Sequence, residues 1–133
     1  MPVTLSLFTL YRDPAAAVRW LVEAFGFEVV ARFGAEDGSV AHAELRLGDA
    51  VVMVQAADGH APAPLVGTST SRAPVLTLDD DAAVDELFAR VERAGATVLI
   101  PPETTEWGNH RFEVLDPEGH QWSVGTHRPG AAW

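Results

Sequence analysis

The feature that most constrains the fold is an apolar stripe of helical spacing that occurs twice in the chain. In the first half the stripe follows a cap at Asp13-Pro14, and in the second half it follows the acidic run at 79–81. Both stripes have the spacing i, i+3, i+4, i+7, at Val18, Leu21, Val22 and Phe25 and again at Val84, Leu87, Phe88 and Val91. This spacing predicts one amphipathic helix in each half, and the glycine that follows each stripe predicts where that helix ends.

Short apolar runs typical of strands accompany each predicted helix, one before it and three after it. In the first half they cover residues 3–10, 27–33, 40–47 and 50–56. In the second half they cover residues 75–78, 96–100, 111–115 and 121–126, and Pro101-Pro102 is expected to end the run at 96–100. The predicted fold class is therefore α+β, with two βαβββ modules in tandem.

The predicted single domain, 1–133, has its first module at 1–57, a connecting loop at 58–72, a second module at 73–128 and a tail at 129–133. One helix covers only one face of a curved four-stranded sheet, so the other face of each sheet stays uncovered. Two such faces can enclose a cleft, which is where small ligands usually bind.

Composition limits the partners of the chain. Its 19 acidic and 9 basic residues give a formal charge of −10, a field that repels phosphate backbones and anionic membranes. We therefore expect neither nucleic acid nor a membrane as partner. The absence of cysteine excludes disulfides, zinc–thiolate sites and thiol nucleophiles. No signal-peptide pattern opens the sequence and no run approaches the roughly 20 apolar residues of a membrane span, so we expect a cytoplasmic protein.

The segment 107–127, WGNHRFEVLDPEGHQWSVGTH, is similar to the C-terminal hairpin of the vicinal oxygen chelate superfamily. That superfamily includes glyoxalases, bleomycin-resistance proteins and extradiol dioxygenases, and is built from paired βαβββ modules. The matching positions are Trp107, Gly108, Phe112, Val114, Asp116, Pro117, Gly119, Trp122, Ser123, Gly125 and Thr126. Residues 13–30 and 42–54 also resemble the family, and the likeness extends over nearly the whole chain except 57–72.

The resemblance implies symmetric metal-ligand positions on the first and last strands of each module, occupied by His, Glu, Gln or Tyr in metal-dependent members. The corresponding positions here are Ser6, Met53, Ala73 or Pro74, and Ser123. Hydroxyl and thioether groups are poor ligands for a divalent ion that needs three or four His, carboxylate or thiolate donors. We therefore expect no metal and no other cofactor, with a divalent metal ion at a rearranged site as the alternative.

The candidate catalytic residues are His42, Glu44 and His110. His42 and Glu44 are two residues apart on a predicted strand, so they project from the same face. His110 follows the same alternation as Phe112 and Val114, and the three candidates converge on a metal or proton-transfer site if the module faces meet. Alternatively, His42 and Glu44 form a polar pair on a solvated face, and His110 is an edge residue without chemistry. Similar sequences usually have arginine in place of His110. The contact with an anion that the resemblance would imply at this position is therefore less expected in this chain.

The candidate ligand-binding residues are Ser6, Phe8, Trp107, Arg111 and Ser123. Trp107 precedes the seventh predicted strand, where it either stacks on a flat or cationic ligand or packs at the rim of the cleft. We interpret Asp79-Asp80-Asp81 as a helix cap rather than a cation site, and Gly67–Ser71 as a linker rather than a phosphate loop. Trp20 is one residue off the first stripe and is expected at a helix edge or an interface. His120 is expected in a turn. Trp133 is expected to be frayed or to lie at a contact between chains.

Two functions agree with these patterns. The first is a bleomycin-resistance-like protein that binds a small organic ligand, cationic or aromatic, in the cleft between modules without a metal. The second is an enzyme of the same superfamily, a lyase, isomerase or dioxygenase, that uses a rearranged metal or a His/Glu acid–base site. Similar proteins are often homodimers, so the resemblance also implies a homodimer.

Overall fold

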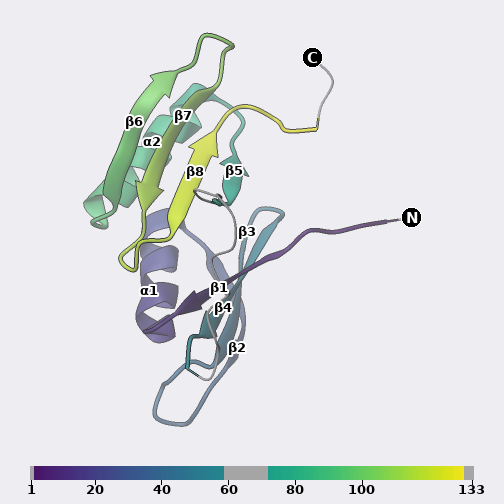
Figure 1. Cartoon of the computed structure of the whole chain (residues 1–133), viewed down its shortest axis with the longest axis vertical. Coiled ribbons are helices and arrows are strands. Elements are labelled where there is room, and N and C mark those ends of the chain that lie inside the picture. Colours follow the sequence, from purple (N-terminus) through teal and green to yellow (C-terminus); the bar gives the residue numbers. More distant parts are fainter. Residues whose placement is uncertain (1, 59–71, 131–133) are drawn as a thin grey trace, which may run out of the picture. The chain divides into compact units, whose positions relative to one another are not determined.

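A computed structural model describes residues 2–58 and 72–130 (Figure 1). Most of the predicted connecting loop, with His60 and Gly67–Ser71, lies outside the described residues, as does Trp133. The chain divides into two compact units, residues 1–22 with 26–72 and residues 23–25 with 73–133. Each unit contains the predicted succession of one strand, one helix and three strands, so the α+β tandem of βαβββ modules is confirmed.

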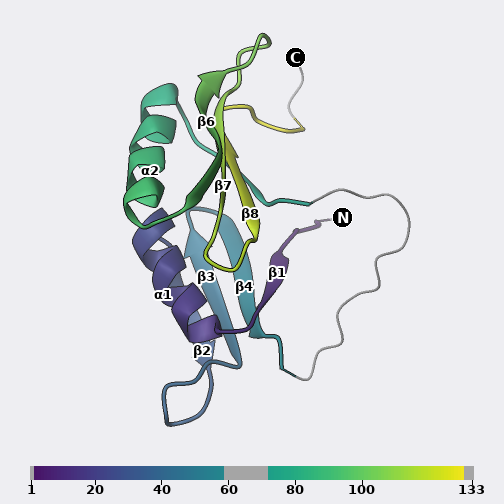
Figure 2. The ribbon, with the colours of Figure 1, turned by 60° about the vertical axis from the view of Figure 1, so that its left-hand side comes forward.

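The first module forms a four-stranded mixed sheet in the order β1-β4-β3-β2. β1 runs parallel to β4, and the other two pairs are antiparallel. Figure 2 shows its helix alongside one face of the sheet. The elements are β1 (Leu7–Tyr11), α1 (Pro14–Phe25), β2 (Glu28–Phe33), β3 (His42–Leu47) and β4 (Ala50–Ala56).

The second module repeats this topology with the order β5-β8-β7-β6. Its first strand again runs parallel to its last, and α2 lies along one face of the sheet (Figure 2). The elements are β5 (Val75–Thr77), α2 (Asp81–Arg93), β6 (Thr97–Thr104), β7 (His110–Leu115) and β8 (Gln121–Gly125). No helix among the described residues is long and apolar enough to cross a membrane.

Both helices begin at an aspartate, as predicted. Asp13 accepts a hydrogen bond from the backbone N–H of Ala16, with proline in the first turn, and Asp80 accepts one from Ala83. Of the acidic run at 79–81, only Asp80 is the cap. Asp79 instead forms an ion pair with Arg128 at 2.6 Å, whereas Asp81 lies in the first turn, where a carboxylate complements the helix dipole.

The predicted stripe of α1 is wrong at Val22, and it is narrower than the buried face of the helix. Trp20 belongs to the buried face of the helix, together with Ala17, Val18, Leu21, Ala24 and Phe25, whereas Val22 is partly exposed. The buried face is therefore wider than an i, i+3, i+4, i+7 stripe, and it includes the large ring that the minimal pattern places at a helix edge.

Two strand boundaries also differ from the prediction. β6 continues through Pro101 and Pro102 instead of ending before them. This strand lies at the edge of its sheet, where a missing backbone N–H costs no ladder hydrogen bond, and its pairing with β7 shifts register on either side of Ile100. The first strand begins at Leu7 rather than at Val3, so residues 3–6 are not part of the sheet.

Candidate functional site

Burial alternates along the strands of the first module and identifies the two faces of its sheet. Ala43, Leu45, Val52 and Val54 are buried, which fits the face that α1 covers. The side chains of His42, Glu44, Met53 and Gln55 therefore lie on the opposite face, which we call the open face of the first sheet. A register error of one residue would have placed Ala41 and Ala43 there instead of His42 and Glu44.

The open face of the first sheet brings His42 and Glu44 together. Nε2 of His42 lies 2.9 Å from Oε2 of Glu44, and both side chains remain partly accessible to solvent. The ring of Phe33 on β2 lies 5.9 Å from the His42 ring, and the cross-strand partner of His42 on β4 is Gln55. The imidazole therefore contacts a carboxylate and an aromatic ring, and a glutamine occupies the cross-strand position opposite it.

Sequence reasoning missed Phe33 and Gln55, for different reasons. The turn Gly48-Asp49 makes Leu47 and Ala50 cross-strand partners, and counting residues outward from this pair makes His42 the partner of Gln55. The position of Gln55 could therefore have been predicted from the sequence. The position of Phe33 depends instead on a register shift in β2 between Val29 and Ala31, and no residue pattern marks that shift.

Two large aromatic side chains share the open face of the first sheet with the His42–Glu44 pair. Phe33 is 60% exposed, and Phe8, on β1, is 57% exposed. Phe8 pairs with Met53, which in turn pairs with Glu44, so these three residues form one row across the sheet. Ser6 follows the alternation of Phe8 but precedes β1. Exposed aromatic rings beside a polar pair are the combination found in small-ligand sites.

The second sheet has an open face of its own. Phe112 and Val114 are fully buried, and the Phe112 ring contacts Phe88 of α2 at 5.3 Å, so these side chains face the helix. Arg111, Glu113 and Ser123 therefore lie on the other face.

Two polar contacts order this second open face. The buried Nη1 of Arg111 lies 3.0 Å from Oε1 of Glu103, as an ion pair rather than a well-oriented hydrogen bond. Glu113 accepts a hydrogen bond of 2.9 Å from Nε2 of Gln121 and is the cross-strand partner of Ser123. Because Glu103 offsets the charge of Arg111, the remaining charge of this face is the carboxylate of Glu113.

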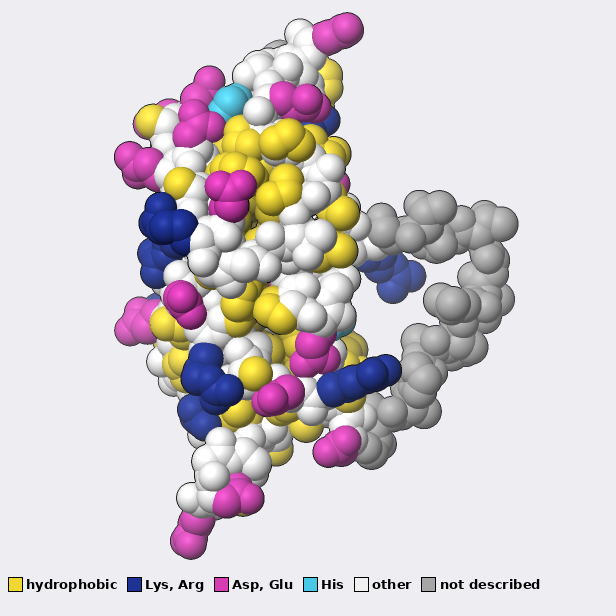
Figure 3. All heavy atoms as spheres, turned by 90° about the vertical axis from the view of Figure 1, so that its left-hand side faces the viewer, with side chains coloured by type: hydrophobic (Ala, Val, Ile, Leu, Met, Phe, Trp, Pro, Cys, Tyr) yellow, Lys and Arg dark blue, Asp and Glu magenta, His cyan; other side chains and the backbone are white. Residues whose placement is uncertain are grey.

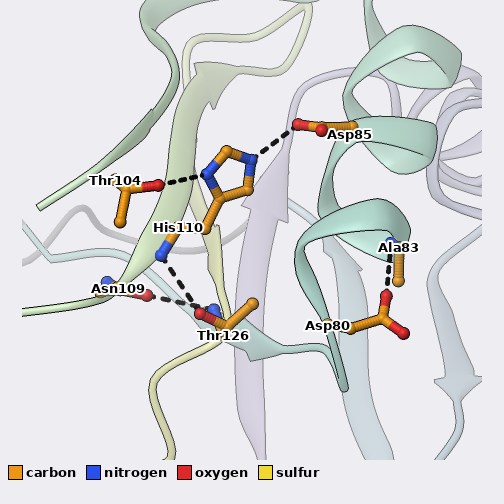
Figure 4. Close-up of polar contacts among 7 residues, drawn as sticks. All are labelled: Asp80, Ala83, Asp85, Thr104, Asn109, His110 and Thr126. Atoms are coloured by element: carbon orange, nitrogen blue, oxygen red, sulfur yellow. Dashed lines mark hydrogen bonds and ion pairs between the residues drawn. The ribbon is translucent and has the colours of Figure 1, made fainter.

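His110 lies on the helix side of its sheet rather than on the open face (Figure 4). Its Nε2 is 2.7 Å from Oδ1 of Asp85 on α2, and its Nδ1 is 2.8 Å from Oγ1 of Thr104. Its backbone N–H donates to the hydroxyl of Thr126. Both ring nitrogens thus connect β7 to neighbouring elements of the second module. The convergence of His110 with His42 and Glu44 on one centre stays a prediction.

Trp107 lies in the turn between β6 and β7, with 54% of its surface exposed, and its ring meets that of His127 edge-on at 5.0 Å. Asn109 holds this turn in place, because its Oδ1 accepts the backbone N–H groups of Thr126 and His127. Gly125 is needed beside it, since a Cβ there would lie 2.6 Å from the same oxygen. Trp107 is therefore presented to solvent by a hydrogen-bonded turn.

The donors at the family's metal positions do not fit a divalent ion. Ser6, Met53 and Ser123 offer hydroxyls and a thioether, and Ala73 and Pro74 offer no side-chain donor. Within residues 2–58 and 72–130, no group of three or more His, Asp or Glu side chains is placed to hold a metal ion. The expected absence of a metal remains a prediction.

Two relatives are about a third identical to this chain over the aligned residues. Rv0887c, an uncharacterized protein of Mycobacterium tuberculosis, is 37% identical over 121 residues, which cover 85% of this chain and 68% of that protein. The crystal structure of TioX from Micromonospora sp. ML1 has 33% identity and a TM-score of 0.76, with coverage of 95% of this chain and 100% of that one.

More distant proteins share the fold alone. The crystal structure of the fosfomycin resistance protein FosX from Mesorhizobium loti superposes with a TM-score of 0.67 at 17% identity, and the match covers 97% of this chain and 95% of that one. The family model described as Glyoxalase/Bleomycin resistance protein/Dioxygenase superfamily matches residues 6–124. With its paired βαβββ modules and this match over most of its length, the chain belongs to the glyoxalase/bleomycin resistance protein/dioxygenase superfamily.

Proposed function

We propose that this protein binds a small aromatic molecule with a positively charged group on the open face of its first sheet, without a metal ion. One observation carries the proposal: the open face of the first sheet exposes more than half of Phe8 and of Phe33, on the same face as the hydrogen-bonded pair of His42 and Glu44. The aromatic rings supply apolar contact area, and Glu44 supplies an acceptor and a negative charge.

The charge of the molecule favours a cationic ligand. The chain carries −10 formally, and each open face contains a carboxylate, Glu44 on the first sheet and Glu113 on the second. A cation above an aromatic ring gains a further 0.5 to 2 kcal/mol, roughly, depending on how far it is desolvated. Ser6 is the remaining candidate contact of the first module, and Trp107, Arg111 and Ser123 stay candidate ligand contacts of the second module.

The proposal is tested with two probes that differ mainly in charge, 1-naphthylmethylamine and 1-naphthylacetic acid. By calorimetry we expect the amine to bind at least about tenfold more tightly than the acid. Phe33→Ala and Glu44→Gln should each weaken binding of the amine by about tenfold, because each removes one contact of the proposed site. Leu99→Ala, which truncates an exposed apolar side chain of β6, is the matched control and should leave the affinity unchanged.

Three results would contradict the proposal: no binding of the amine, equal binding of amine and acid, or equal binding by wild type and Phe33→Ala.

Metal independence is tested separately. Protein purified without chelator should contain far less than one equivalent of transition metal per chain by elemental mass spectrometry, and incubation with nickel, zinc, manganese or iron(II) should not raise its affinity for the amine. A near-stoichiometric metal that survives dialysis would overturn the metal-free part of the proposal. His42 and Glu44 would then be the first residues to substitute.

A second candidate function is acid–base catalysis by the same residues, without or with a divalent metal ion. The observation that favours it is the 2.9 Å contact between His42 and Glu44, in which the carboxylate orients the imidazole as a general base requires. Turnover of a bound compound distinguishes the two functions. His42→Gln would abolish turnover and retain binding if the pair is catalytic, whereas a binding protein shows no turnover at all.

A further inference from the structure

Three polar side chains form a connected row across β6, β7 and α2, on the helix side of the second sheet (Figure 4). Oγ1 of Thr104 lies 2.8 Å from Nδ1 of His110, and Nε2 of the same ring lies 2.7 Å from Oδ1 of Asp85. One imidazole therefore lies between a hydroxyl and a carboxylate, which is the order of nucleophile, base and orienting acid in many hydrolases. The proposed ligand of the first sheet does not use this row.

The two contacts of the imidazole determine which ring nitrogen carries the proton. An ionised carboxylate can only accept a hydrogen bond, so Nε2 of the neutral ring carries the proton and donates to Asp85. Nδ1 is then an acceptor, and the hydroxyl of Thr104 is its donor. The hydroxyl proton of Thr104 therefore already points at a base, as it must before a general base can activate a nucleophile.

The backbone holds the three side chains in place and leaves the hydroxyl accessible. Thr104 and His110 are cross-strand partners, and the backbone N–H of His110 donates to the hydroxyl of Thr126. Asp85 lies just over one turn beyond Asp80, which caps α2. Only 14% of the imidazole side chain is exposed, whereas Thr104 is an exposed residue. An external molecule can therefore reach the nucleophile while its base stays enclosed.

We propose that Thr104 is a nucleophile that accepts the acyl group of an activated ester, with His110 as its general base and Asp85 as the residue that positions His110. Oγ1 of Thr104 forms a bond to the carbonyl carbon as its proton moves to Nδ1 of His110. The bond to the leaving oxygen then breaks, and that oxygen takes the proton from the imidazolium. The products are an ester on Thr104 and a free phenol or alcohol. Water then hydrolyses the ester by the same route and releases a carboxylic acid.

The substrate class follows from what these three side chains supply. They provide a nucleophile, its base and an orienting carboxylate, but none of them donates a hydrogen bond to the oxyanion that forms on the carbonyl oxygen. The acyl donor must therefore have a good leaving group, as an aryl ester does, because its transition state then needs less stabilisation.

Mass spectrometry after incubation with p-nitrophenyl acetate tests whether Thr104 is acylated. The chain contains neither lysine nor cysteine, whose amines and thiols would compete for the acetyl group. The tryptic peptide 94–111 contains Thr104 together with two internal controls, Thr97 and Thr105. Thr97 is also on β6 and exposed, but its cross-strand partner is Leu115. Acetyl groups should appear on Thr104 at least about tenfold faster than on either control, because only Thr104 donates to an imidazole.

Release of p-nitrophenol measures the same step even when water hydrolyses the acetyl ester too quickly for it to accumulate. The initial rate above the buffer rate should fall at least about tenfold in Thr104→Val and in His110→Gln, since each lacks one partner of the proton transfer. Thr104→Ser keeps a hydroxyl and should keep most of the rate. Thr97→Val is the matched control and should release p-nitrophenol as fast as the wild type.

Asp85→Asn separates a positioning role from a purely structural one. The carboxamide can donate to Nε2, which moves the ring proton to Nδ1 and leaves Thr104 without a base. We expect p-nitrophenol release to fall at least about tenfold and the ¹⁵N chemical shifts of His110 to change from those of the Nε2–H to those of the Nδ1–H tautomer. Because the Asp85 side chain is 58% exposed, the circular dichroism spectrum should stay that of the wild type.

Two results would overturn the proposal. One is equal release of p-nitrophenol by the wild type and Thr104→Val, which would leave the reaction to a histidine that attacks the ester directly. The other is acetylation of Thr97, Thr104 and Thr105 at equal rates. Equal release by the wild type and a folded Asp85→Asn would refute the positioning role of Asp85.

Discussion

At the residue scale, the carboxylate of Asp116 holds together the turn between β7 and β8. Asp116 is only 4% exposed and accepts hydrogen bonds from the backbone N–H groups of Glu118 and His120 and from Nε1 of Trp122. These contacts explain why an aspartate begins the D-P-E-G turn and why a tryptophan follows it. They also confirm that His120 has a turn position, as expected.

Replacement of Asp116 by alanine should therefore be strongly destabilising. It leaves the backbone N–H groups of Glu118 and His120 and the buried Nε1 of Trp122 without this acceptor, which we expect to lower the free energy of unfolding by about 2 to 4 kcal/mol. Chemical denaturation of the wild type and the variant measures the change. Asp49→Ala, in the exposed turn between β3 and β4, should cost less than about 0.5 kcal/mol. Equal losses in the two variants would refute this role of Asp116.

The pKa of Asp37 is lowered by a local turn. The backbone N–H of Ser39 donates to its carboxylate at 2.9 Å, and the Ser39 side chain adds a smaller effect in the same direction. A lowered folded-state pKa stabilises the fold above the unfolded pKa, and that contribution is lost as the pH falls through the folded value. In an NMR titration Asp37 should lose its charge at a lower pH than an unstructured aspartate.

The matched variant for this titration is Ser39→Ala. It should raise the pKa of Asp37 only part of the way toward the ordinary value, because the backbone donor remains. A pKa of Asp37 that already equals that of an unstructured aspartate in the wild type would show that the turn is not formed in solution.

At the element scale, both helices could be predicted because each has a local start signal and an apolar periodicity. Asp13 and Asp80 cap the helices where the pattern places a cap. The strands were harder, because their limits depend on neighbours. β6 retains Pro101 and Pro102 only because it lies at an edge, and Val3 and Thr4 leave the sheet because β4 begins at Ala50 and is too short to pair with them.

The site was predictable to the extent that it depends on period-2 alternation. His42 and Glu44 share a face by that rule alone, and the structure places them 2.9 Å apart. The surroundings of His110 depend instead on which face α2 covers and on where Asp85 lies along that helix. Neither fact can be obtained from a strand pattern, so its contact with Asp85 could not have been predicted.

The cap of α2 provides a test at this scale. Asp80→Ala removes the acceptor of the Ala83 N–H and should lower the free energy of unfolding by about 1 kcal/mol. Asp79→Ala removes only an ion pair on the surface and should cost less than about half as much. Equal effects in thermal or chemical denaturation would show that the acidic run acts through its total charge rather than through one cap.

At the scale of the whole molecule, the chain carries a formal charge of −10, and its acidic side chains are not gathered into one patch on the face that Figure 3 shows. On the face drawn in Figure 3, acidic side chains are spread among apolar and basic ones. Such a distribution gives a long-range attraction for cations without defining where they bind. The position of a bound ligand must therefore come from short-range contacts such as those of Phe8, Phe33 and Glu44.

If the net charge attracts the ligand at long range and short-range contacts fix its position, the affinity for a cationic ligand should depend on salt concentration. Raising the ionic strength from about 0.02 M to about 0.5 M should weaken binding of 1-naphthylmethylamine several-fold, because salt screens the field of the molecule. The acid should show the opposite or no trend. Calorimetry at both ionic strengths measures the effect, and an affinity of the amine that does not change with salt would refute the electrostatic contribution.

The central claim is that an aromatic cation binds at the open face of the first sheet without a metal. Its most direct test is a titration of ¹⁵N-labelled, chelator-treated protein with 1-naphthylmethylamine, followed by two-dimensional NMR. We predict saturable shifts of the backbone amides of Phe8, Phe33, His42 and Glu44, together with their β4 neighbours. Shifts confined to residues elsewhere, or shifts that appear only after a divalent metal is added, would contradict the claim.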